Sequence, residues 1–116
     1  MNIYMHSQDF GITPSIGRRI QSQLQRALGP YEEEIMSIEV YLTDQNGPRG
    51  GADKRCLLRI SVRGLPPASA HATHGDLYVA IDCSARKLRR LVKRSLAKSR
   101  RFSRGRLAPE PLPAAG

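Results

Sequence analysis

The segment from residue 76 to about residue 101 has the strongest pattern in this sequence, because its apolar and basic residues separate onto opposite sides of a helix. At about 100° per residue, the small and apolar residues of the segment share one arc. They are Leu77, Ala80, Ile81, Ser84, Ala85, Leu88, Leu91, Val92 and Leu96. The opposite arc carries the bases Arg86, Arg89, Arg90, Lys93, Arg94, Arg100 and Arg101. Such a helix has to pack one side against a second layer and expose the other. We therefore predict a long surface helix that is capped by Asp76 and ends near Arg101.

The net charge of +9 is concentrated in this helix and the residues just after it. Residues 83–109 contain eleven Arg and Lys and no Asp or Glu, whereas residues 1–82 contain eight bases and nine acids. A solvated helix face usually mixes both signs, because opposite charges four positions apart stabilise a helix. Here the residues four apart have like charges, as in Arg86 with Arg90 and Arg90 with Arg94, which costs helix stability. This face therefore favours binding to a polyanion over simple solvation.

Length and composition suit one small domain with an aliphatic core, since the 116 residues are 40% hydrophobic and include no Trp and two Phe. We expect a cytoplasmic protein without membrane contact. The first residues lack the basic and apolar regions of a signal peptide, and the longest uncharged stretch, residues 64–75, is too short to cross a bilayer. Cys56 and Cys83 fit reduced thiols better than a disulfide framework.

Alternating residues and turn signals place the remaining elements. Thr13 and Pro14 read as the cap and first residue of a helix with one apolar stripe, and Gly29 with Pro30 ends it. Alternation of apolar and polar residues predicts four strands. These strands cover residues 1–6, 38–43, 56–63 and, with a weaker pattern, 68–73.

The resulting order, βαβββα, predicts an α+β fold. Because each helix has a single apolar stripe, a two-layer sandwich with a four-stranded sheet and both helices on one face buries every stripe. This architecture is like that of double-stranded-RNA-binding domains with an additional first strand. We expect the domain to cover residues 1–101 and the Pro/Ala-rich residues 102–116 to be disordered. Fold alone does not establish function.

A glycine-rich turn at residues 44–53 lies beside a second group of bases, Arg49, Lys54 and Arg55. The turn is not a P-loop, because it lacks the Gly-Lys-Ser/Thr ending and joins two strands. Two interpretations stay open. The turn is either a flexible hairpin tip or a basic finger whose glycine N–H groups approach phosphate.

Nothing in the sequence predicts catalysis, a metal site, a cofactor or a small-molecule substrate. His71 and His74 do not have the spacing of metal ligands with Cys56. Cys83 has no His or Asn partner that would activate it as a nucleophile. The three glutamates at residues 32–34 fit a solvated loop better than a catalytic carboxylate set.

The four tyrosines, Tyr4, Tyr31, Tyr41 and Tyr78, belong to four different elements. We therefore expect no aromatic platform of the kind that sheets use to bind single strands. The basic helix then indicates recognition of backbone phosphates and shape rather than of bases.

Residues 1 to about 101 resemble the ribosome hibernation-promoting factor and ribosome-associated inhibitor family, also called ribosomal subunit interface or sigma-54 modulation proteins, in its short form. The most specific strings are DQNGPRGGADKRC at residues 44–56 and DLYVAID at residues 76–82, which fits the family pattern D-x-Y-x-A-I-D. Long members carry a second, dimerising domain, whereas this chain continues into a short Pro-rich tail.

The resemblance implies a non-enzymatic stress or stationary-phase factor that binds small-subunit rRNA between head and body. There it would overlap the tRNA and mRNA positions and block initiation. The RNA-binding residues that it implies on the last helix are Arg86, Lys87, Arg89, Arg90, Lys93 and Arg94. To these we add Arg49, Lys54 and Arg55 of the glycine-rich turn. Two alternatives stay open: a generic double-stranded-RNA-binding module, and a regulator that binds an acidic protein partner.

Overall fold

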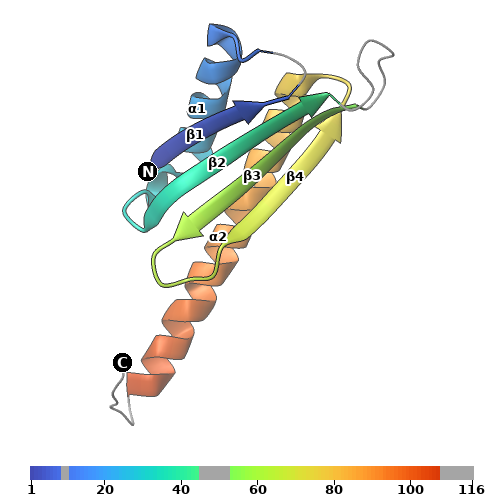
Figure 1. Ribbon diagram of the computed structural model, residues 1–116. Helices are drawn as coiled ribbons and strands as arrows, with labels where there is room; N and C mark the ends of the chain where they lie inside the picture. The colour runs from blue at the N-terminus through green and yellow to red at the C-terminus, as the bar shows by residue number, and fades with distance from the viewer. Residues whose placement is uncertain (9–10, 45–52, 108–116) are drawn as a thin grey trace.

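The computed structural model describes residues 1–8, 11–44 and 53–99 in full, together with the helical backbone of residues 100–107 (Figure 1). The elements in chain order are β1 Asn2–Ser7, α1 Pro14–Leu28, the short 3-10 helix η1 Gly29–Tyr31, β2 Ile35–Asp44, β3 Lys54–Val62, β4 Ala68–His74 and α2 Leu77–Leu107. Apart from η1, this is the predicted βαβββα order, and the α+β fold is confirmed.

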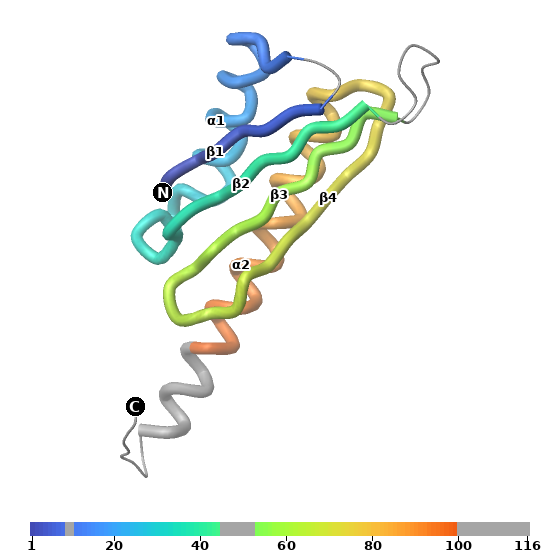
Figure 2. The backbone as a smooth tube through the Cα atoms, in the orientation of Figure 1, coloured from blue at the N-terminus to red at the C-terminus, as the bar shows by residue number. Residues whose placement is uncertain are grey.

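The strands form one mixed sheet in the order β1-β2-β3-β4. β1 pairs parallel with β2, because α1 carries the chain back across the sheet between them. β2, β3 and β4 form an antiparallel meander. Figures 1 and 2 show both helices on the same face of the sheet. No element of the described chain covers the other face.

An aliphatic core fills the space between the sheet and the helices, as the composition predicted. The inward residues of β2 and β3 alternate with outward ones, and the stripes of α1 and α2 close over them. Fully buried core residues include Ile20, Leu24, Leu28, Ile38, Val40, Leu42, Leu58, Ile60, Ile81 and Leu88. β4 contributes only two buried alanines, Ala70 and Ala72. Because these side chains are small, α2 can lie close against β4.

The first helix begins and ends where the sequence predicts. The Thr13 hydroxyl oxygen accepts a hydrogen bond from the Ile16 N–H at 3.2 Å, with Pro14 in the first helical position. Gly29 keeps a right-handed φ of −50°, so the chain continues into η1 rather than into a left-handed glycine cap. Gly64, in the turn between β3 and β4, has φ +78°, a backbone conformation in which a residue with a side chain would be strained.

α2 begins as predicted and extends further than predicted. The Asp76 carboxylate accepts a hydrogen bond from the Tyr78 N–H at 2.9 Å, and the Asp76 N–H donates to His74 Nδ1 at 2.9 Å. The helix continues to Leu107, six residues beyond the predicted end near Arg101. No proline interrupts it before Pro109, and Pro is the residue that stops a helix most strongly.

In Figure 1 the C-terminal part of α2 projects past the β3–β4 turn. Helical backbone thus enters the segment 102–116 for which the sequence predicts disorder. Residues 108–116 of that segment lie outside the described residues, as do residues 45–52 of the glycine-rich turn, which include Arg49.

Candidate nucleic-acid interface

The basic side of α2 points away from the core and is exposed to solvent. Six bases lie there with exposed side chains: Arg86, Lys87, Arg89, Arg90, Lys93 and Arg94. We call this set the α2 basic face. On the opposite side of the helix Leu88 and Val92 are buried in the core, so packing against the core fixes the position of the helix. None of the six bases forms a salt bridge with a carboxylate of the described residues. Their charges are therefore available to an external anion.

Half of the α2 basic face borders a shallow groove between α2 and the edge strand β4. The groove has a volume of about 360 Å³. Its lining residues are Ser69, Ala70, His71, Lys87, Arg90, Leu91 and Arg94. Lys87 Nζ donates a hydrogen bond to the carbonyl oxygen of His71 at 3.0 Å, which ties the helix to the strand. The groove thus presents cationic side chains along the free edge of the sheet.

A clamp between the two helices fixes the start of this face. Arg19 of α1 binds the Asp82 carboxylate with both ends of its guanidinium, at 2.7 Å from Nη2 and 3.0 Å from Nε. The guanidinium carbon also lies 5.4 Å from the centre of the Tyr78 ring. The hydrogen bond from Arg19 holds the pKa of Asp82 below its ordinary value, and the same bond raises the pKa of Arg19. The two shifts agree in direction, as expected for a formed ion pair.

The clamp explains part of the DLYVAID string in physical terms. Asp76 caps α2, Tyr78 and Asp82 hold Arg19, and the small and apolar residues Ala80 and Ile81 are buried. Each of these residues therefore helps to position the helix.

We expect Asp82→Asn to lower the melting temperature slightly at pH 7, because the pair is partly exposed and such pairs stabilise weakly. The native pKa of Asp82 is depressed, so its contribution is present above the unfolded carboxyl pKa of about 3.9 and is lost as the pH falls through the lower native value. Thermal unfolding from pH 7 to pH 2 should show the two proteins converging at the acid end. A constant difference across this range would show that the ion pair is not the source of the effect.

Lys54 and Arg55, from the second predicted group of bases, lie on β3 and not on the α2 basic face. Lys54 is half-buried, and its Nζ lies 3.1 Å from an Asp44 oxygen and 3.3 Å from an Asp53 oxygen. The hydrogen bond to Asp44 raises the pKa of Lys54, and Asp53 itself is buried. Lys54 therefore lies where β2 and β3 meet the hairpin turn, and its charge is balanced by the Asp44 and Asp53 carboxylates. Arg55, the next residue, points to the open face of the sheet, and Arg49 lies outside the described residues.

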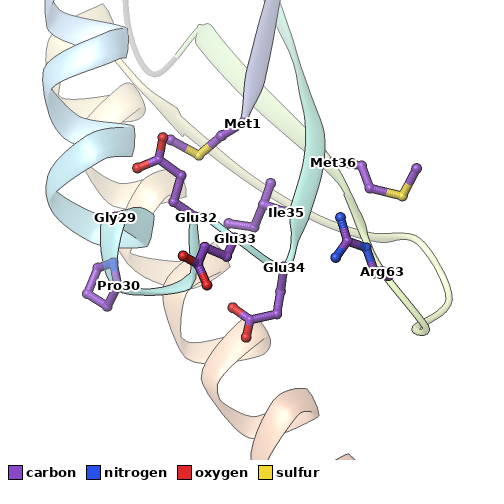
Figure 3. A pocket seen from close by; sticks show the side chains of 9 residues that line it. All are labelled: Met1, Gly29, Pro30, Glu32, Glu33, Glu34, Ile35, Met36 and Arg63. Carbon is purple, nitrogen blue, oxygen red and sulfur yellow. The ribbon is translucent and has the colours of Figure 1, made fainter.

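A wider hollow lies where α1 ends and β2 begins (Figure 3). It has a volume of about 810 Å³ and is lined by Met1, Gly29, Pro30, Glu32, Glu33, Glu34, Ile35, Met36 and Arg63. Three glutamates and one arginine give the hollow a net negative charge, which would repel a polyanion. Glu32 and Glu33 are exposed, as predicted for a solvated loop.

The cysteines are free, and their surroundings differ. Cys56 is buried, which raises the pKa of its thiol to about 11 and keeps it protonated at neutral pH. Cys83 is half-buried, and its sulfur accepts a hydrogen bond from Arg86. Over the described ranges, no three His, Cys, Asp or Glu side chains gather in a way that fits a metal ion. Within those same ranges, no helix is both long and apolar enough to span a bilayer.

The open face of the sheet carries an aromatic feature that was not predicted from the sequence. The rings of His6 and Tyr41 stack with their centres 4.8 Å apart and their planes 16° apart. Tyr4 is on the same face and half exposed. The four tyrosines do lie in four different elements, but the strand order brings Tyr4 and Tyr41 onto one face of the sheet. The alternating pattern of each strand indicates that both tyrosines point outward. It places them on one face only once β1 is known to pair with β2.

Comparison with known proteins places the chain in a family. Residues 3–100 match the family described as Sigma 54 modulation protein / S30EA ribosomal protein. The chain belongs to this family. The resemblance inferred from the sequence is thereby confirmed. No curated protein gives a significant match.

Two solved structures are similar to this Sigma 54 modulation protein / S30EA family member. A ribosomal subunit interface protein from Coxiella burnetii is 23% identical with a TM-score of 0.73, covering 84% of this chain and 99% of that one, and it shows the shared fold. The N-terminal domain of Protein Y from Thermus thermophilus is 26% identical with a TM-score of 0.68, covering 81% of this chain and 98% of that one.

Proposed function

We propose that this protein is a cytoplasmic, ribosome-associated translation inhibitor of the hibernation type, active under stress or in stationary phase. It binds rRNA of the small subunit through the α2 basic face and occupies the positions of tRNA and mRNA. Membership of the family and the subunit interface protein among its structural neighbours support the ribosome as partner. The observation that carries the proposal is the set of six exposed bases, none of which forms a salt bridge with a carboxylate of the described residues.

The mechanism requires positioning and no bond chemistry. α2 is held by its buried stripe and by the bond from Lys87 to β4, so the α2 basic face keeps its shape when it meets phosphates. A preorganised surface loses little side-chain and backbone freedom on binding, which favours affinity. A folded domain seated on rRNA then excludes other ligands by its volume alone. Inhibition should therefore be stoichiometric and reversible.

The test is co-sedimentation of the full chain with purified small subunits over a range of salt concentrations. If the six bases neutralise about six phosphates, log K should fall with log salt with a slope of about −4 to −5. A slope near zero would point to an acidic protein partner instead. Equal affinity for an unrelated RNA duplex would indicate a generic RNA-binding module without ribosomal specificity.

We further expect the functional domain to end near residue 101. The last buried side chain of the described residues is Leu96, so the segment after it adds little to the core. A chain truncated after Arg101 should retain its far-UV circular dichroism per residue and inhibit cell-free translation nearly as well as the full chain. Complete loss of inhibition in a folded truncated protein would place the function in residues 102–116 and not on the α2 basic face.

A further inference from the structure

The open face of the sheet carries a row of side chains that crosses all four strands. His6 of β1 is in register with Tyr41 of β2, Tyr41 with Leu57 of β3, and Leu57 with His71 of β4. Three of the four side chains are rings, and His6 and Tyr41 are already stacked on each other. We call this set the cross-strand row. It spans three strand spacings, or about 14 Å.

The hydroxyl group at the centre of the row has its partner within the protein. The Tyr41 hydroxyl donates a hydrogen bond to Glu39 Oε1 at 3.0 Å. This bond raises the pKa of Tyr41 above its ordinary value, while the nearby Arg59 opposes the shift. The phenol donor is thus satisfied within the protein, which leaves the ring surface as the group that Tyr41 offers to a ligand.

Cationic side chains flank the row. Arg55 and Arg59 lie on β3, two residues to either side of Leu57 and on the same face of the sheet. At one end of the row, His71 also lines the groove that Lys87, Arg90 and Arg94 border. The cross-strand row is therefore continuous with the α2 basic face around the β4 edge.

We propose that the cross-strand row binds a few unpaired nucleotides of RNA, with a base stacked against the His6–Tyr41 pair and the phosphates near Arg55 and Arg59. The proposal rests on the proposed function for RNA as the partner of the α2 basic face. Rings flanked by arginines suit single strands, because an unpaired base exposes its flat face and its phosphates remain anionic. A duplex keeps its base faces stacked inside and binds only to the cations. The structure thus assigns a single-stranded segment to the open face of the sheet and the phosphates of a duplex to the α2 basic face.

The test uses the full chain and a single-stranded RNA of about ten nucleotides that carries 2-aminopurine at its centre, with the duplex of the same sequence for comparison. Tyr41→Leu should weaken single-strand binding by at least about fivefold and reduce the change in 2-aminopurine fluorescence, because a stacking ring is lost. Duplex affinity should stay the same. Tyr41→Phe is the matched control, since it keeps the ring and removes only the hydroxyl, and it should bind like the parent protein.

His6→Leu provides a second, more exposed variant in case Tyr41→Leu unfolds, and it should also weaken single-strand binding selectively. Unchanged single-strand affinity in the folded variants, or an equal loss on the duplex, would overturn the proposal. Co-sedimentation of the parent protein with small subunits separates this failure from failure of the proposed function, because it depends on the α2 basic face. If Tyr41→Leu lowers co-sedimentation but not single-strand affinity, the sheet contacts a ribosomal protein and the proposal is wrong.

Discussion

Replacing Arg90 and Arg94 together by glutamate is expected to weaken binding to the small subunit by about 100-fold or more at about 0.1 M salt. Each phosphate contact contributes about 0.7–0.9 to the salt slope, so losing two contacts alone costs some tens-fold at this salt concentration. The new carboxylates then repel the phosphates that the arginines attracted. Both side chains are exposed, so the fold should be retained.

The matched control for this variant is Arg18→Glu with Arg26→Glu. These arginines are exposed on α1, and their replacement changes the net charge by the same amount. Co-sedimentation should be affected far less in the control, with a salt slope close to that of the parent protein. An equal loss in both double variants would show that overall charge governs binding and that the α2 basic face is not the contact surface.

The sequence predicted the α2 basic face well because the pattern that defines it is local. Residues such as Leu88 and Arg90 fall on opposite sides of a helix by their spacing alone, whatever the helix packs against. Asp76 could be assigned as the cap for the same reason, since a cap bonds a backbone group only two residues further on. The end of α2 was less predictable, because frayed turns depend on weak preferences rather than on a periodic stripe.

The remaining features depend on contacts between residues far apart in the chain. Arg19 and Asp82 are 63 positions apart, and no local pattern pairs them. Alternation shows that Tyr41 points outward from its strand, but only the strand order and register place it beside His6. Lys54 was grouped with Arg49 and Arg55 because they are close in sequence, whereas the fold places its ammonium group beside the carboxylates of Asp44 and Asp53.

The packing behind the α2 basic face gives the second large effect. Leu88→Ala is expected to lower the free energy of unfolding by about 2–5 kcal/mol, because Leu88 is fully buried and the truncation leaves a cavity between α2 and the sheet. A loss of this size is a large part of the roughly 5–15 kcal/mol that stabilises a small domain. Urea unfolding followed by far-UV circular dichroism measures it directly.

Leu91→Ala is the matched control, because it makes the same chemical change on the same helix at a half-buried position in the groove wall. Its loss should be clearly smaller, and an equal or larger loss would contradict the packing of α2 described above. The bases of the α2 basic face are unchanged in Leu88→Ala. Under conditions where that variant stays folded, its salt slope for small-subunit binding should therefore equal that of the parent protein. A changed slope would mean that Leu88 sets the spacing of the bases as well as the stability of the helix.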